Sequence, residues 1–152
     1  KPILLVKPDA ALSNEAKMIV DDMKNIYIIG GEGAVSGSIA EELENYGTVV
    51  RVSGKTRYET SVAVANTFFT EAEKSVVASG KNFPDGLCGG PLAAAMDAPL
   101  ILTADGKTDA AEAYVAEHAI ASGYVLGGEG ALSNQTILDV FNLENIENMT
   151  AK

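Results

Sequence analysis

Basic and hydroxyl-bearing side chains gather in one short stretch of this 152-residue chain. Arg51, Lys55 and Arg57 place three of its 11 basic residues within seven positions, and Lys81 follows a second apolar run. Clustered cations and hydroxyls at strand ends suit an anionic or polyhydroxyl ligand. Alternatively, the two arginines pair with local carboxylates and fix the loops. The carboxylates considered are Glu59 and Asp85. The residues alone favour neither interpretation.

Two glycine-rich loops form the next candidate. Residues 30–33 and 127–130 both read Gly-Gly-Glu-Gly, and each follows an apolar run and precedes a helical pattern. Backbone N–H groups in such loops can cradle a phosphate. However, the glycine spacing matches neither common phosphate-binding motif, and Glu32 and Glu129 would repel an anion. We therefore interpret both loops as structural turns, in which glycine permits positive φ.

The sequence shows no convincing arrangement of the residues that usually carry out catalysis. Asp85 has the context of a helix N-cap, and no second carboxylate stands at a catalytic spacing from it. Cys88 lies in a Gly/Ala-rich stretch that is typical of a small packing residue. His118 is the only histidine, which argues against a histidine-built metal site or a Ser/His/Asp triad. We expect a non-enzymatic chain with no metal site and no cofactor.

Composition excludes other classes of protein. The chain has 11 basic and 21 acidic residues, a net charge of −10, which argues against a nucleic-acid binder. No apolar run approaches the roughly 20 residues of a membrane helix, so we expect no membrane insertion. The apolar fraction of 47% supports a packed core.

An internal repeat organises the chain. Gly-Gly-Glu-Gly-Ala-Val-Ser begins at residue 30, and Gly-Gly-Glu-Gly-Ala-Leu-Ser begins 97 positions later. The apolar segments 2–6 and 99–103 have the same offset. Residues 1–50 thus correspond to 98–147, giving about one and a half units. We predict that 1–47 are the second half of a preceding unit, 48–147 a complete unit, and 148–152 a tail.

Strand-like and helix-like patterns alternate along the chain. Short apolar runs predict strands at 2–6, 26–29, 48–52, 75–78, 99–103 and 123–126. Helical spacing predicts helices at 14–24, 36–43, 57–69, 85–96, 108–121 and 133–141. This alternation indicates an α/β fold with a small, mostly parallel sheet flanked by helices. Ligand sites in such folds lie at the strand ends, where the loops described above also stand.

Several of these motifs, in their order, resemble a known family. They are Arg51-Val52-Ser53-Gly54-x-x-Arg57-Tyr58-Glu59-Thr60, Ala78-Ser79-Gly80-x-Asn82-Phe83-Pro84-Asp85-Gly86-Leu87, Ala98-Pro99-Leu100-Ile101-Leu102-Thr103 and Tyr124-Val125-Leu126-Gly127-Gly128. Together they look like the type 2 cell-wall-binding repeat of Gram-positive surface proteins. The likeness covers 51–143 as one unit, and 2–43 resemble the second half of another. Gly86 and Cys88 depart from the Ala or Ser usual in that pattern.

The resemblance implies a Toprim-like α/β module that usually occurs in threes. Such modules anchor S-layer and related surface proteins non-covalently to an anionic secondary polysaccharide of the wall. Catalytic activities, such as an amidase or protease, belong to other domains of the parent protein. The implied location is secreted, at the cell wall, although no signal peptide pattern is visible in the sequence.

The resemblance also implies a set of residues that bind the polymer or hold modules together. With the two lysines of the basic cluster, the predicted set is Arg51, Ser53, Gly54, Lys55, Arg57, Tyr58, Lys81, Asn82, Asp85 and Thr103. Residues 1–50 lack their own first half, so they should expose a sheet edge and an apolar face. We therefore predict packing against neighbouring modules or self-association, including a swapped form.

Two alternatives remain open from the sequence. One is a structural assembly module without polymer affinity. The other is a phosphate- or nucleotide-handling α/β enzyme domain that uses the glycine-rich loops. A Toprim-type nuclease would need a carboxylate cluster for Mg²⁺, and no Asp-x-Asp stands beside a predicted strand.

Overall fold

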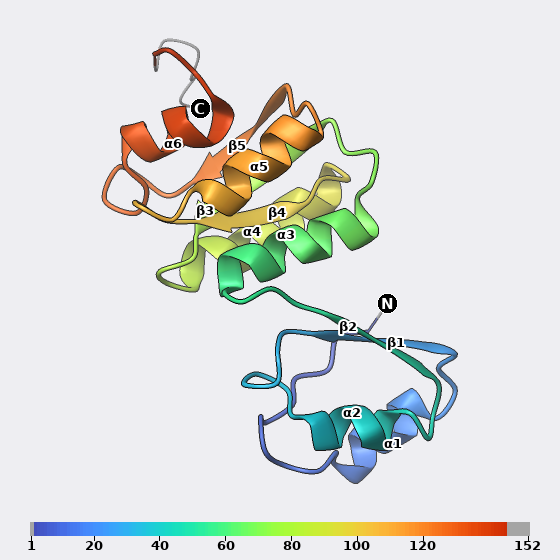
Figure 1. Ribbon diagram of the computed structural model, residues 1–152. Helices are drawn as coiled ribbons and strands as arrows, with labels where there is room; N and C mark the ends of the chain where they lie inside the picture. The colour runs from blue at the N-terminus through green and yellow to red at the C-terminus, as the bar shows by residue number, and fades with distance from the viewer. Residues whose placement is uncertain (1, 146–152) are drawn as a thin grey trace. The chain divides into compact units, whose positions relative to one another are not determined.

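The computed structural model describes residues 2–145, which form an α/β fold of two compact units (Figure 1). The first unit runs through residue 55 and the second starts at residue 56. The first contains α1 (Asn14–Val20), β1 (Asn25–Ile29), α2 (Gly37–Leu43) and β2 (Thr48–Val52). The second contains α3 (Arg57–Phe68), β3 (Lys74–Ser79), α4 (Pro84–Ala95), β4 (Leu100–Thr103), α5 (Asp109–Glu117), β5 (Ser122–Leu126) and α6 (Asn134–Phe141).

The second unit is built on a three-stranded parallel sheet with the order β4-β3-β5. The central strand β3 pairs Val76 with Leu100 on one side and with Tyr124 on the other. Five of its six residues are buried. Burial on both faces explains its near-continuous run of small and apolar residues, which is typical of parallel strands.

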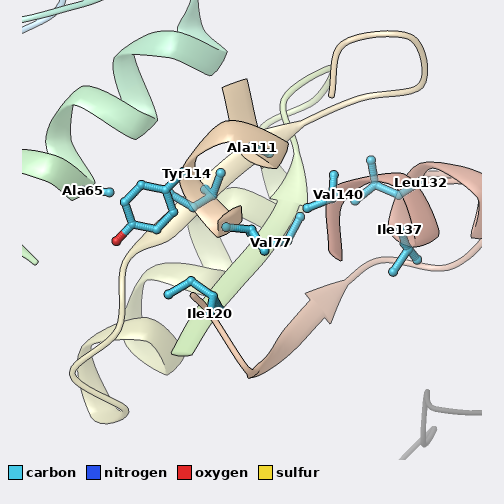
Figure 2. Packing of buried hydrophobic residues seen from close by; sticks show 10 residues of the cluster. Ala65, Val77, Ala111, Tyr114, Ile120, Leu132, Ile137 and Val140 are labelled. Carbon is cyan, nitrogen blue, oxygen red and sulfur yellow. The ribbon is translucent and has the colours of Figure 1, made fainter. Parts of the chain in front are cut away.

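Helices cover both faces of this sheet. On one face, Val77 and Ile101 pack with residues of α3, α5 and α6, and Figure 2 shows the Tyr114 ring of α5 pointing toward Ala65 of α3. The buried Tyr114 hydroxyl donates to the Phe69 carbonyl at 3.5 Å. On the other face, α4 packs against β3 and β4. The sequence pattern predicted this layered arrangement, and it is confirmed.

The first unit has a smaller sheet with one helical layer. Strands β1 and β2 are parallel, with Asn25 opposite Thr48. The core side of the sheet is covered by α1 and α2, and the buried cluster consists of Leu12, Val20, Ile28, Ile39 and Leu43. Ile29 and Val50 remain 47% and 40% exposed.

The predicted strand at 2–6 is wrong, since the structure shows no strand there. Its repeat counterpart β4 is a strand because it pairs with β3. Within residues 2–145 the first unit holds no counterpart of β3, so residues 3–6 have no neighbouring strand to bond. The other five predicted strands are confirmed within two residues at each end.

Backbone geometry supports the 97-residue repeat. Gly30 and Gly127 follow β1 and β5, with φ of 114° and 101°. A Cβ at either position would lie 3.0 Å or 2.8 Å from the side chain of an alanine four residues later, Ala34 or Ala131. Both the dihedral angle and the close approach require glycine. The interpretation of these loops as structural turns agrees with this geometry.

The compact units and the predicted repeat units divide the chain at different places. Strand β2 pairs with β1 and therefore lies in the first unit, although the sequence repeat assigns residues 48–52 to the second. The repeat boundaries at 47/48 and 147/148 remain a proposal about the sequence. The predicted tail at 148–152 lies outside the described residues.

Candidate functional site

Polar side chains of the second unit gather at one edge of its sheet. The C-terminal ends of β3, β4 and β5 share this edge because the strands are parallel. We call the loops that follow them, residues 80–83, 104–108 and 127–133, the loop edge. It holds Lys81, Asn82 and Asp105, and α6 begins beside it.

Asp105 connects the elements of the loop edge. Its Oδ1 accepts hydrogen bonds from the Thr136 hydroxyl at 2.6 Å and the Ser133 backbone N–H at 3.0 Å. Its Oδ2 lies 3.4 Å from Lys81 Nζ. The hydrogen bonds from Thr136 and then Ser133 hold the pKa of Asp105 well below its usual value, and the charge of Lys81 lowers the pKa further. Asp105 thus joins the loops after β3 and β4 to the start of α6.

The two arginines of the predicted site bind backbone carbonyls. Arg57 Nη1 donates to the Gly80 carbonyl at 2.8 Å, which ties the start of α3 to the end of β3. In the first unit, Arg51 donates to the carbonyls of Gly30 at 2.8 Å and Ser36 at 3.5 Å. These contacts favour the loop-fixing interpretation, with carbonyls as partners in place of the expected carboxylates. Glu59 instead accepts from the Thr56 N–H in a capping box at the start of α3.

The other predicted residues have varied surroundings. Ser53, Lys55 and Asn82 are exposed, and Gly54 is half-buried. The Tyr58 ring lies so close to Gly80 that a Cβ there would be 2.5 Å from the ring. Thr103 is fully buried, and its hydroxyl donates to the Lys107 carbonyl at 3.2 Å.

Asp85 lies in the first turn of α4, where a carboxylate stabilises the helix terminus. A Cβ at Gly127 would be 2.9 Å from its Oδ2, so Asp85 packs beside the loop after β5. Tyr58, Asp85 and Thr103 therefore have structural surroundings, whereas Lys81 and Asn82 face solvent. The set divides between the two units: positions 51–55 belong to the first, and the others to the second.

Sequence reasoning missed Asp105, Ser133 and Thr136 as site residues. The sequence offered one indication of Asp105, which was its position. Asp105 lies two residues after the end of β4, as Lys81 lies two residues after the end of β3. The contact with α6 depends on a separation of 28 residues along the chain, which local patterns do not report.

Among residues 2–145, no group of three His, Cys, Asp or Glu side chains is placed to hold a metal ion. Cys88 is exposed. Over the same range, no helix has the length and apolar character needed to cross a membrane.

Two open hollows lie on the surface of the second unit. One, of about 380 Å³, lies between α5 and α6 and includes Glu112 and Asp139. The other, of about 290 Å³, is lined by residues 68–72 and Asp97. Both contain carboxylates, so neither suits an anion.

Comparisons with known proteins agree with this architecture. The model of the family described as cell wall binding domain 2 (CWB2) matches residues 51–137. The amidase enhancer of Bacillus subtilis (strain 168) is 36% identical over 107 residues, which are 70% of this chain and 15% of that protein. The N-acetylmuramoyl-L-alanine amidase LytC of the same strain is 31% identical over 137 residues, 88% of this chain and 27% of that protein.

Two solved structures share the fold. Cwp8 from Clostridium difficile superposes with a TM-score of 0.79 and 30% identity over 93% of this chain and 25% of that one. Cwp6 from the same organism gives a TM-score of 0.71 over 92% of this chain and 24% of that one, and at 24% identity it supports the fold alone. The chain thus spans about a quarter or less of the proteins it matches. Because the family model covers more than half of its 152 residues, the chain belongs to the cell wall binding domain 2 family.

Proposed function

We propose that this chain is a non-catalytic module that anchors the polypeptide carrying it to the Gram-positive cell wall by binding an anionic secondary polysaccharide. The observation that carries the proposal is the match of the cell wall binding domain 2 model to residues 51–137. Secretion to the cell surface, and an S-layer or related parent, belong to the same proposal. The Toprim-like description of the fold remains a prediction.

The loop edge is where we place the polymer. Lys81 keeps half of its side chain exposed, and its 3.4 Å contact with Asp105 is a surface ion pair of small energetic value. The ammonium group can therefore exchange this partner for a polymer anion. Arg57 uses Nη1 for the Gly80 carbonyl, and the guanidinium group has further N–H donors for an anionic oxygen.

An extended polymer suits this surface better than a small substrate. The two hollows described above are open and contain carboxylates, whereas Lys81 stands on an exposed loop and Arg57 at the exposed start of α3. The net charge of −10 opposes an anion at long range. Salt screens that repulsion beyond roughly 8 Å, so local cations decide the contact. Each contact is weak, and several modules on one polymer supply retention through avidity.

Co-sedimentation with purified cell walls tests the proposal, before and after their secondary polysaccharide is stripped. We expect binding to intact walls, loss of binding on stripping, and weaker binding as salt rises. Lys81→Gln should weaken binding. Lys74→Gln is the matched control, because Lys74 is exposed at the opposite, N-terminal end of β3. Binding that survives stripping would show that the secondary polysaccharide is not the ligand, although the chain would still be a wall-binding module.

A second candidate is an assembly module without polymer affinity. The exposed apolar residues of the first unit favour this candidate, since Ile3 and Leu5 are 89% and 97% exposed. It predicts association with neighbouring modules or with a second copy, and no sedimentation with either wall preparation. Analytical ultracentrifugation over a range of concentrations would measure such self-association.

A further inference from the structure

Phe83 and Leu87 are the most exposed large apolar side chains that the structure describes in the second unit. They are 79% and 70% exposed, whereas Tyr124, which follows them, is 44% exposed. Phe83 belongs to the loop edge, and Leu87 lies in the first turn of α4. The Leu87 N–H donates to the Phe83 carbonyl at 2.9 Å, so the two side chains stand on the same side of the helix. They form an apolar patch that continues the loop edge onto α4.

Packing of the core does not account for this patch. On α4, Gly89 and Ala93 are buried, and a Cβ added to Gly89 would lie 2.8 Å from Leu126 of β5. These two residues mark the side of the helix that faces the sheet, and Phe83 and Leu87 lie outside it. Burial therefore gives no reason for two large apolar side chains at this place.

Formation of the helix does not account for Phe83 either. It occupies the N-cap position of α4, where the side-chain oxygen of a serine, threonine, asparagine or aspartate would bond a free backbone N–H. The N-cap residues of the other helices within residues 2–145 are all serine or threonine, namely Ser13, Ser36, Thr56, Thr108 and Ser133. Phenylalanine gives up the contact that these residues can make. A residue that serves neither the core nor its own helix is a candidate for binding.

A cationic side chain and an amide side chain stand beside the Phe83 ring. Lys81 and Asn82 directly precede Phe83, and both are exposed. The Cα atoms of Lys81 and Phe83 are at most about 7.6 Å apart, since successive Cα atoms are about 3.8 Å apart. Asp85 is the one charged residue of α4, and its Oδ2 lies toward Gly127 in the loop after β5. One sugar residue with its substituents could therefore contact the ring, the amide and the ammonium group together.

We infer that Phe83 is the residue of the loop edge that packs against a sugar ring of the wall polymer, with Leu87 extending the contact. This inference rests on the proposed function, and it adds recognition of the ring to recognition of charge. One face of a pyranose ring carries several C–H groups, which pack favourably on the electron-rich face of an aromatic ring. Asn82 can donate to and accept from the ring hydroxyls, and Lys81 can bind an anionic substituent.

The surroundings of Phe83 also define the class of polymer. An anionic chain of pyranose units offers both the charge that Lys81 attracts and the apolar ring face that Phe83 covers. A polyol phosphate chain without rings offers the charge alone. The loop edge should therefore favour the first class over the second.

Co-sedimentation with purified cell walls tests Phe83 through two substitutions. Phe83→Ser removes the ring and supplies a residue that is favoured at an N-cap. We expect its binding to fall by about tenfold, as for the loss of one stacked ring, and its melting temperature to match or exceed that of the parent chain. Phe83→Tyr keeps the ring and should bind within about twofold of the parent.

Two further variants serve as references. Tyr124→Ser is the matched control, because it removes an exposed aromatic side chain in the middle of β5, away from the loop edge. Its binding should equal that of the parent. Lys81→Gln separates charge from stacking: the loss that it causes should shrink as salt rises. The loss caused by Phe83→Ser should not shrink, because stacking involves no net charge.

Four results would overturn the inference. Phe83→Ser could bind as well as the parent chain, which would leave the proposed function standing. Its loss could be shared by Phe83→Tyr, or could fade with salt as the loss from Lys81→Gln does. Self-association of the parent that Phe83→Ser abolishes, with wall binding unchanged, would identify a protein as the partner of the patch. No sedimentation of the parent with any wall preparation would overturn the proposed function, and this inference with it.

Discussion

The two units of this chain start from similar sequence and reach different structures. Residues 3–6 and β4 are repeat counterparts of apolar character, yet only β4 is a strand. Ile101 in β4 is fully buried, whereas its counterpart Leu4 is half-buried. The difference follows from β3, which bonds to β4 and, within residues 2–145, has no counterpart beside residues 3–6. An apolar run becomes a strand when a neighbour satisfies its backbone groups.

A second difference concerns the junction with the last helix of the repeat. In the second unit, the Ser133 N–H donates to the Asp105 carboxylate. In the first unit, the counterpart Ser36 N–H donates to the backbone carbonyl of Pro8, at 3.2 Å. Pro8 is the counterpart of Asp105. The hydrogen bond from this serine N–H is thus present in both units, although its acceptor is a side-chain carboxylate in one and a backbone carbonyl in the other. The position of an acceptor at this junction is therefore better preserved between the units than the type of residue that supplies it.

The largest expected contrast lies in the cores. Ile101→Ala should lower the free energy of unfolding of the second unit by about 3 kcal/mol, because it leaves a cavity in a fully buried cluster. Leu4→Ala should cost the first unit about 1 kcal/mol, because Leu4 is only partly covered. Denaturant titration with residue-resolved hydrogen exchange separates the units. Equal costs would show that Leu4 is as well packed as Ile101.

The helix caps give a smaller contrast. The Ser133 hydroxyl accepts from the Thr136 N–H at 3.2 Å, whereas Ser36 makes no such bond to α2 and its hydroxyl instead contacts Ser38. Ser133→Ala should therefore cost about 1 kcal/mol, and Ser36→Ala close to zero. Thermal unfolding of each variant, followed by methyl resonances of each unit, measures this contrast. A larger loss of stability from Ser36→Ala than from Ser133→Ala would show that Ser36, and not Ser133, is the serine that stabilises its helix as an N-cap.

The smallest expected effect is on the pH dependence of stability. The folded-state pKa of Asp105 lies below its unfolded value, so its contribution is present above about pH 4 and lost as the pH falls further. Asp105→Asn should make the acid-induced loss of stability shallower in the second unit. Melting of the variant and the parent chain is compared between about pH 2 and pH 7.

The first unit provides the internal control for this experiment. The hydrogen bond from Lys17, followed by that from the Leu12 N–H, lowers the pKa of Glu42, so this unit has its own acid-sensitive carboxylate. Asp105→Asn should leave the acid sensitivity of the first unit unchanged. An unchanged acid dependence in the second unit would exclude Asp105 as a source of its stability.

Much of the fold was predictable from local pattern. The apolar runs located five strands, and the repeat spacing located Gly30 and Gly127 as equivalent turns. The candidate site was predictable only in part. Lys81 and Asn82 were correctly expected on a loop at a strand end, but the carbonyl partners of Arg51 and Arg57 were not foreseen. Asp105 was missed because its partners lie far along the chain.

The sequence alone determined the alternation of strands and helices, the 97-residue repeat and the family. These properties can be recognised from local hydrophobic periodicity and from the order of the motifs, which do not depend on distant contacts. Only the tertiary structure decided that β2 pairs with β1, that residues 3–6 form no strand, and that Asp105 joins the loops to α6. Each of these outcomes depends on which distant segment supplies a backbone or side-chain partner, and this choice is made by the packing of the whole unit.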